Sequence, residues 1–242
     1  WFSCACCPPN IARTIASLWQ YIYTADEDTA YVHLYIGNES EIQLTGNTLR
    51  IRQTTDYPWS GKVVLEINAD TEEPMTVALR IPTWSEDKYS ICVDGVCQDI
   101  CAEKNGYVHI KRNWKGNHQI TLELKMEPKL VQANRKIHYN GGRAALVCGP
   151  VVYCLEETDN GKYLNQILVD AKSDWKVTEG TLGGKSLILE GRGWREQSQT
   201  DEESLYHVYH EEREEIMITA VPYFLWNNRS DGEMQVWMRV GR

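Results

Sequence analysis

The stretch YVHLYI, residues 31–36, marks the point where a helical pattern gives way to β-strands. Its aliphatic residues recur at every second position, and this period places them on one face of a strand. The alternation returns at residues 63–67, 77–81 and 120–126, and Asp94-Gly95 between two short apolar runs is a strong hairpin signal. Many short strands with Gly, Asn and Asp turns between them are typical of antiparallel β-sandwiches.

Before this stretch, the sequence predicts one helix. Residues 1–10, WFSCACCPPN, read as a loop, because two consecutive prolines oppose a preceding helical turn, and Asn10 is a suitable N-cap. Apolar residues then follow at helical spacing: Ile11, Ile15, Leu18, Trp19 and Ile22.

After the first set of strands, a polar stretch near Pro128 predicts a domain boundary. A second set of strand patterns follows at residues 144–147, 151–155, 187–189 and 216–221. The chain starts at Trp1 inside a dense motif, and we interpret it as part of a longer protein.

The composition argues against two classes of partner. The net charge of −9 disfavours nucleic acid, because contacts to phosphates require a basic face. No apolar run approaches the roughly 20 residues that a membrane-spanning helix needs. The chain has 9 Trp and 13 Tyr but 2 Phe, which suits stacking on sugar rings, although sandwich cores also favour aromatic residues.

Three of the eight cysteines lie within four positions, Cys4, Cys6 and Cys7. This crowding favours metal or thiolate chemistry over a disulfide framework, and it suggests a reducing, cytoplasmic location. Cys6 and Cys7 come just before the predicted helix, and thiols at a helix N-terminus ionise more readily. Buried or adventitiously paired thiols are the alternative interpretation of the same residues.

A second pattern that suggests metal binding is the acidic segment at residues 200–215, TDEESLYHVYHEEREE. It contains His207 and His210, and a His-x-x-His pair beside carboxylates suits a metal ion. A solvated loop or edge strand with exposed histidines is the interpretation that we favour.

Five motifs in one order resemble those of glycoside hydrolase family 127, the β-L-arabinofuranosidases and their relatives. The first is Ser3-Cys4-Ala5-Cys6-Cys7-Pro8-Pro9-Asn10. The other four are DYPW at 56–59, LRIPTW at 79–84, GPVVYCLE at 149–156, and PY at 222–223 with GEMQVW at 232–237. They extend over nearly the whole chain, which makes the resemblance specific.

The resemblance implies a mainly β fold, in which the terminal helix of an (α/α)6 barrel is followed by two antiparallel β-sandwich domains. Residues 1–25 would end the catalytic barrel. The first sandwich would comprise residues 26–127 together with 234–242, because the last strand of the family returns to it. Residues 128–233 would form the second sandwich.

The resemblance also implies a retaining glycosidase that uses zinc. Cys6 would be both the catalytic nucleophile and a zinc ligand, Cys7 would be a second zinc ligand, and Cys4 matches no role. The remaining zinc ligands, the acid/base glutamate and the sugar-binding histidines would lie upstream of Trp1. The full-length protein would release β-L-arabinofuranose from non-reducing ends, and residues 1–242 alone would be inactive.

Two other functions fit the same sequence. One is a non-catalytic sandwich module that binds a glycan or mediates dimerisation. The other is a glycosidase of different specificity on the same scaffold. For either glycosidase, the expected partner is a sugar. For the β-L-arabinofuranosidase, this sugar is an arabinose-containing oligosaccharide or glycan. The sequence is also compatible with a homodimer.

Overall fold

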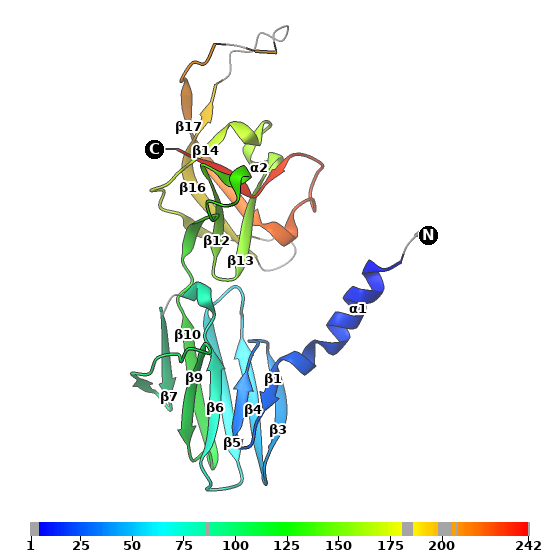
Figure 1. The fold of residues 1–242 in the computed structure, drawn as a ribbon, viewed down its shortest axis with the longest axis vertical. Helices are drawn as coiled ribbons and strands as arrows, with labels where there is room; N and C mark the ends of the chain where they lie inside the picture. The colour runs from blue at the N-terminus through cyan, green and yellow to red at the C-terminus, as the bar shows by residue number, and fades with distance from the viewer. Residues whose placement is uncertain (1–4, 86–87, 181–185, 198–204, 207, 242) are drawn as a thin grey trace. The chain divides into compact units, whose positions relative to one another are not determined.

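The chain folds into two compact units, Trp1–Met126 and Glu127–Arg242. The computed structural model describes residues 5–85, 88–180, 186–197, 205–206 and 208–241. Strands dominate both units, and the longest described helix lies at the start of unit 1 (Figure 1). Within the described residues, no helix is long and apolar enough to cross a bilayer.

The N-terminal helix α1 spans Cys7–Ser17 and begins earlier than the sequence predicts. Pro8 and Pro9 lie inside its first turn, where backbone N–H groups have no partner within the helix, so the prolines remove no hydrogen bond. Asn10 is therefore not the N-cap, a position that Cys6 takes. The other short helices are η1 (Leu18–Tyr21), η2 (Thr83–Ser85), η3 (His138–Asn140), α2 (Glu157–Asn160), η4 (Leu164–Gln166) and η5 (Tyr223–Leu225).

Unit 1 is a sandwich of two sheets. The four-stranded sheet has the order β1-β2-β6-β9 and the six-stranded sheet the order β3-β4-β5-β10-β7-β8. The pair β2–β6 is parallel, so this sandwich is not wholly antiparallel as expected. The strands are β1 (Tyr23–Ala25), β2 (Thr29–Val32), β3 (Asn38–Leu44), β4 (Asn47–Thr55), β5 (Lys62–Ala69), β6 (Met75–Arg80), β7 (Tyr89–Val93), β8 (Val96–Gln98), β9 (Tyr107–Arg112) and β10 (Gly116–Leu124).

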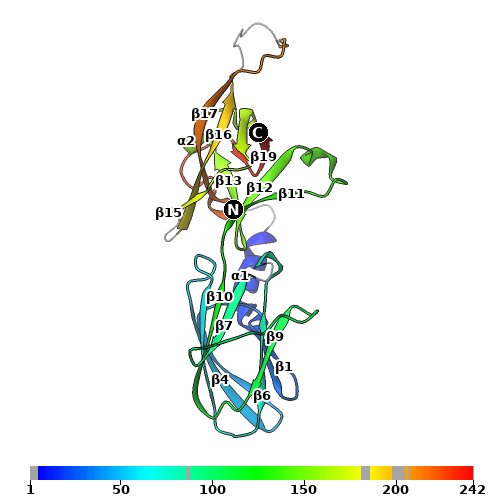
Figure 2. The same cartoon turned by 90° about the vertical axis from the view of Figure 1, so that its left-hand side faces the viewer.

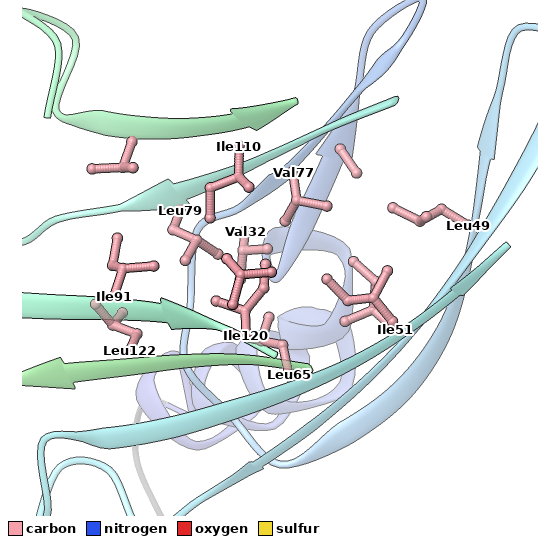
Figure 3. Close-up of a cluster of buried hydrophobic side chains, with 14 of the residues drawn as sticks. Val32, Leu49, Ile51, Leu65, Val77, Leu79, Ile91, Ile110, Ile120 and Leu122 are labelled. Atoms are coloured by element: carbon pink, nitrogen blue, oxygen red, sulfur yellow. The ribbon is translucent and has the colours of Figure 1, made fainter. Parts of the chain in front are cut away.

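The alternation that predicts these strands also builds the core. Figure 2 shows β4, β7 and β10 in one layer and β1, β6 and β9 in the other. The inward-facing aliphatic side chains of both layers meet between them (Figure 3). Asp94 and Gly95 have φ of 49° and 81° and connect β7 to β8, which confirms the predicted hairpin.

Unit 2 is one continuous nine-stranded sheet. Its order is β11-β12-β19-β14-β16-β17-β13-β18, with β15 beside β16, and a further pairing of β12 with β13 closes the sheet on itself. The strands are β11 (Pro128–Gln132), β12 (Arg143–Cys148), β13 (Val151–Glu156), β14 (Ile167–Asp170), β15 (Lys176–Gly180), β16 (Ser186–Glu196), β17 (Arg213–Pro222), β18 (Met234–Gln235) and β19 (Trp237–Gly241).

The last strand lies in unit 2, so the expectation that residues 234–242 return to the first sandwich is wrong. β19 pairs antiparallel with β12 and parallel with β14, and β18 pairs with β13. This position satisfies backbone groups of two neighbouring strands at once, and it buries Met238. The alternation of an isolated strand specifies which face is buried, but it does not specify the partner.

Candidate functional site

Cys6 and Cys7 lie together at the N-terminus of α1. Both thiols are exposed, and their Sγ atoms are 3.6 Å apart. The side-chain amide of Asn10 donates to the Cys6 carbonyl oxygen at 2.8 Å, and Arg13 donates to Asn10 Oδ1 at 3.1 Å. This network ties the cysteine pair to the first turn of the helix, where the helix dipole favours negative charge.

The spacing of the two sulfurs fits a shared metal ion. Two thiolates bound to one tetrahedral zinc with bonds of about 2.3 Å have sulfurs about 3.8 Å apart, close to the distance found. The described residues contain no group of three or more His, Cys, Asp or Glu suited to a metal. The described residues therefore offer two neighbouring sulfurs, fewer than the four ligands of a tetrahedral zinc.

The other free cysteines that the structure describes differ from this pair. Cys148 and Cys154 are buried, and burial raises the pKa of Cys154 to about 12. Such thiols stay protonated at neutral pH and are poor nucleophiles. Cys101 is exposed but lies in the loop after β8, away in sequence from any helix N-terminus. Cys6 and Cys7 are consequently the cysteines whose surroundings suit thiolate chemistry.

Cys92 and Cys97 form a disulfide across the β7–β8 hairpin. The register of the hairpin places them directly opposite each other. This bond differs from the expectation that the cysteines are reduced, and the Asp-Gly turn between them was the signal that could have predicted it.

The alternative metal ligands receive no support from the described residues. Cys4 and His207 lie outside them, as do residues 200–204 of the acidic segment. His210 is exposed and belongs to no described strand.

An apolar face of α1 is exposed to solvent. Helix α1 has no buried residue, and Ile15 within it and Trp19 in the following turn η1 are each 69% exposed. Their helical spacing predicted this helix. In the described residues of unit 1, however, nothing packs against its apolar face. Such a face is typical of a helix that packs against further structure.

Two of the family-like motifs meet in unit 1, where they stabilise the fold. Tyr57 of the 56–59 motif shares a side-chain hydrogen bond with Trp84 of the 79–84 motif, in which the indole N–H is the donor. The ring of Tyr57 also lies 6.0 Å from that of Tyr35, whose hydroxyl donates to the Arg80 carbonyl oxygen at 2.5 Å. Both Tyr57 and Trp84 pack against the core.

In unit 2 the 149–156 motif pairs with both parts of the last motif, since Tyr153 lies opposite Pro222 and Glu156 opposite Met234. It also carries a buried carboxylate to which the sequence assigned no role. Glu156 ends β13, and its side chain, which is 5% exposed, pairs with Arg229. Asp159 binds the same guanidinium, and the backbone N–H of Asn227 donates to Glu156 at 2.7 Å. These contacts join the 149–156 motif to the segment that precedes β18.

Comparisons with known proteins agree with this geometry along the whole chain. A family model described as "Beta-L-arabinofuranosidase, GH127 middle domain" matches residues 29–126. A second model, "Glycoside hydrolase family 127 C-terminal domain", matches residues 128–239. The chain belongs to glycoside hydrolase family 127.

Curated and solved relatives within family 127 cover the segment before residue 29 as well. The chain is 35% identical to a non-reducing end β-L-arabinofuranosidase of Bifidobacterium longum subsp. longum, over 99% of this chain and 37% of that protein. The crystal structure of a family 127 β-L-arabinofuranosidase from Geobacillus stearothermophilus T6 matches with a TM-score of 0.94 and 34% identity, over 100% of this chain and 38% of the other. A solved family 127 β-arabinofuranosidase matches with a TM-score of 0.88 and 29% identity, over 100% and 39% of the two chains. The chain thus spans less than half the length of these relatives.

Proposed function

We propose that this chain is the C-terminal part of a retaining β-L-arabinofuranosidase, with Cys6 as the nucleophile. The observation that carries the proposal is the exposed Cys6–Cys7 pair at the N-terminus of α1, with sulfurs 3.6 Å apart. The relatives named β-L-arabinofuranosidases support the reaction and the sugar.

Helix α1 and the following turn η1 form the end of a helical catalytic barrel in this proposal. Residues 23–25, which we expected there as well, instead form β1 and pair with β2 of unit 1. The exposed Ile11 and Ile15 of α1 and Trp19 of η1 support the barrel assignment, because they give this segment an apolar face that suits packing against neighbouring helices. The relatives are more than twice as long as this chain, which leaves ample length for such a barrel.

The chemistry of the nucleophile follows the two steps of retaining glycosidases, with sulfur in place of a carboxylate. The Cys6 thiolate attacks the anomeric carbon, a C–S bond forms, and the C–O bond to the leaving group breaks. An acid/base glutamate, which we assign to the part of the relatives that this chain does not span, protonates the departing oxygen. The same group then deprotonates a water molecule, which attacks the anomeric carbon and returns the sulfur as a thiolate.

Cys6 and Cys7 are the residues that would hold a zinc ion. Bound zinc would keep the sulfurs ionised at neutral pH and would stabilise the thiolate when it leaves. Cys7 holds its sulfur beside that of Cys6, while the hydrogen bond from Asn10 fixes the backbone that carries the nucleophile.

The test of the nucleophile is Cys6→Ser in the full-length protein, with an aryl β-L-arabinofuranoside as substrate. We expect turnover to be lost, because an alcohol at neutral pH is a far poorer nucleophile than a thiolate. Cys101→Ser is the matched control, since Cys101 is also exposed and free, and it should keep full turnover. Retention of turnover by Cys6→Ser would contradict the assignment.

The test of the metal is zinc analysis of residues 1–242 beside the full-length protein. Two thiolates leave a zinc ion without half of its ligands, so the shorter chain should hold no stoichiometric zinc and should be inactive. One equivalent of tightly bound zinc in residues 1–242 would contradict this, and it would direct attention to Cys4, His207 and His210.

A further inference from the structure

A polar groove on the outer face of the six-stranded sheet of unit 1 is separate from the cysteine pair. Its volume is about 660 Å³, and strands β3, β4, β5 and β10 together with the β7–β8 turn line it. Among the described residues that line it, the only aromatic side chain is the imidazole of His118. Its floor is the backbone of the sheet at Ile51 and Ile67, whose side chains point into the core on the other face.

Two rows of polar side chains that line the groove cross four strands. The register places Glu41 opposite Arg50, Arg50 opposite Asn68, and Asn68 opposite Asn117. Since neighbouring strands are about 4.8 Å apart, this row offers a new hydrogen-bonding side chain at each such step.

The second row runs parallel to the first, two residues further along each strand. It consists of Glu39, Arg52, Glu66 and Gln119. The third row, which contains Thr54 and Thr121 on either side of Val64, lies outside the groove. Of these three rows, the first two line the groove.

The charges of the lattice exclude an anionic ligand. Arg50 already pairs with Glu41 at 3.0 Å and with Asp70 at 3.1 Å. Arg52 pairs with Glu39 at 3.2 Å and lies 3.9 Å from Glu66. Both guanidinium groups are therefore neutralised, and the groove has four lining carboxylates for two arginines.

One end of the groove is held rigidly by Asp94. The backbone N–H of Gln119 donates to this carboxylate at 2.8 Å, His118 Nδ1 lies 2.9 Å from it, and Arg112 lies 3.1 Å from it. The hydrogen bond from Gln119 is the main cause that lowers the pKa of Asp94. In the first row, Asn68 donates to Asn117 at 2.8 Å. The remaining donors and acceptors of these two amides are directed to solvent.

We propose that this groove binds a neutral oligosaccharide that lies across the strands. Each sugar hydroxyl both donates and accepts a hydrogen bond, and the two rows offer carboxylate acceptors and amide groups of both kinds at regular intervals. A neutral chain has no charge to be repelled by the acidic excess. Without a stacking platform the contacts are hydrogen bonds, so binding is weak for one sugar and increases with the number of sugar units.

Such a groove would hold a glycan on the enzyme at a place other than the reacting end. The choice of an arabinose-containing sugar rests on the proposed function, whereas the charge and hydrogen-bonding arguments rest on the groove alone. A cationic peptide is the competing ligand that the acidic excess would also admit.

The experiment compares the full-length protein with its Asn68→Ala/Asn117→Ala variant by calorimetric titration. The probe is an α-linked arabino-oligosaccharide, which lacks the terminal β-L-arabinofuranose that the reaction would consume. We expect binding to the wild type, and about tenfold weaker binding to the variant, because two modest hydrogen bonds are lost. Thr54→Ala, on the same face of β4 but outside the groove, should bind as the wild type does.

Several outcomes would overturn the proposal. They are the absence of binding to the wild type, equal binding by the wild type and the double variant at unchanged melting temperature, or preferential binding of oligolysine in the groove. Turnover of the aryl arabinofuranoside is measured on the same preparations. Turnover without oligosaccharide binding refutes only the groove, and binding without turnover refutes only the proposed reaction.

Discussion

Replacing Arg229 with methionine should destabilise unit 2 more than any ordinary surface substitution. Arg229 binds Glu156 and Asp159, and these two side chains are 5% and 17% exposed. The hydrogen bonds from its guanidinium group to Asp159 and Glu156 raise the pKa of Arg229. In Arg229→Met the apolar stem is kept, but two nearby carboxylates lose their shared counter-charge.

The magnitude follows from the burial of Glu156. Removing one partner of a buried ion pair costs about 3–5 kcal/mol, because the other charge stays desolvated. Here the Asn227 N–H still donates to Glu156, and Asp159 can gain water, so we expect the lower end, about 3 kcal/mol. The Glu156→Gln exchange removes the buried charge while it keeps an acceptor for Asn227. In the double variant, Arg229→Met should therefore cost about 2 kcal/mol less than it does alone.

The assay is amide hydrogen exchange of β13, β17 and β18, the strands that these contacts join. A loss of about 3 kcal/mol corresponds to roughly 150-fold faster exchange in amides that require global opening of the unit. The strands of unit 1 serve as the internal control and should keep their rates. A change below fivefold in Arg229→Met, or no coupling with Glu156→Gln, would refute the view that this buried pair anchors the segment before β18.

Two further predictions concern packing and pH. In Gly61→Ala the new Cβ would lie 1.8 Å from the Leu124 carbonyl oxygen, so β5 and β10 must separate and the free energy of unfolding of unit 1 should fall by about 2–3 kcal/mol in urea titrations. Gly37→Ala, whose Cβ would meet nothing closer than 3.8 Å, should be nearly neutral, and equal costs for the two variants would contradict the clash. The hydrogen bonds from Arg239 lower the pKa of Glu196. Between the lowered pKa of Glu196 in the folded protein and its pKa in the unfolded chain, the unfolded state binds more protons. The Glu196–Arg239 pair therefore stabilises the fold at neutral pH. This contribution is lost as the pH falls through the lowered pKa. Arg239→Gln should thus cost stability at pH 7 and progressively less below about pH 4, and a cost that is independent of pH would contradict the linkage.

The sequence by itself predicted several of the strands, including β5, β6 and β10, the helix near residues 11–22 and the cysteine pair. These features follow from local rules: alternation of apolar residues in strands such as β5 and β10, the Asp94-Gly95 turn, and helical spacing from Ile11 to Ile22. The family resemblance rested on the same local motifs, and the family models that match residues 29–126 and 128–239 confirm it. The N-cap was wrong because Pro8 and Pro9 are tolerated in a first helical turn, where no backbone N–H is needed.

Only the tertiary structure decided which strands and side chains meet. The partners of β19, the closure of the unit 2 sheet and the parallel β2–β6 pair join segments far apart in the sequence. The ion pair of Glu156 with Arg229 and the two polar rows of the groove depend on the same pairings. A strand pattern specifies which side chains are buried. The backbone hydrogen bonds that join a strand to its neighbours, however, are the same for every residue type. The choice of neighbour and register therefore depends on the packing of the whole sheet.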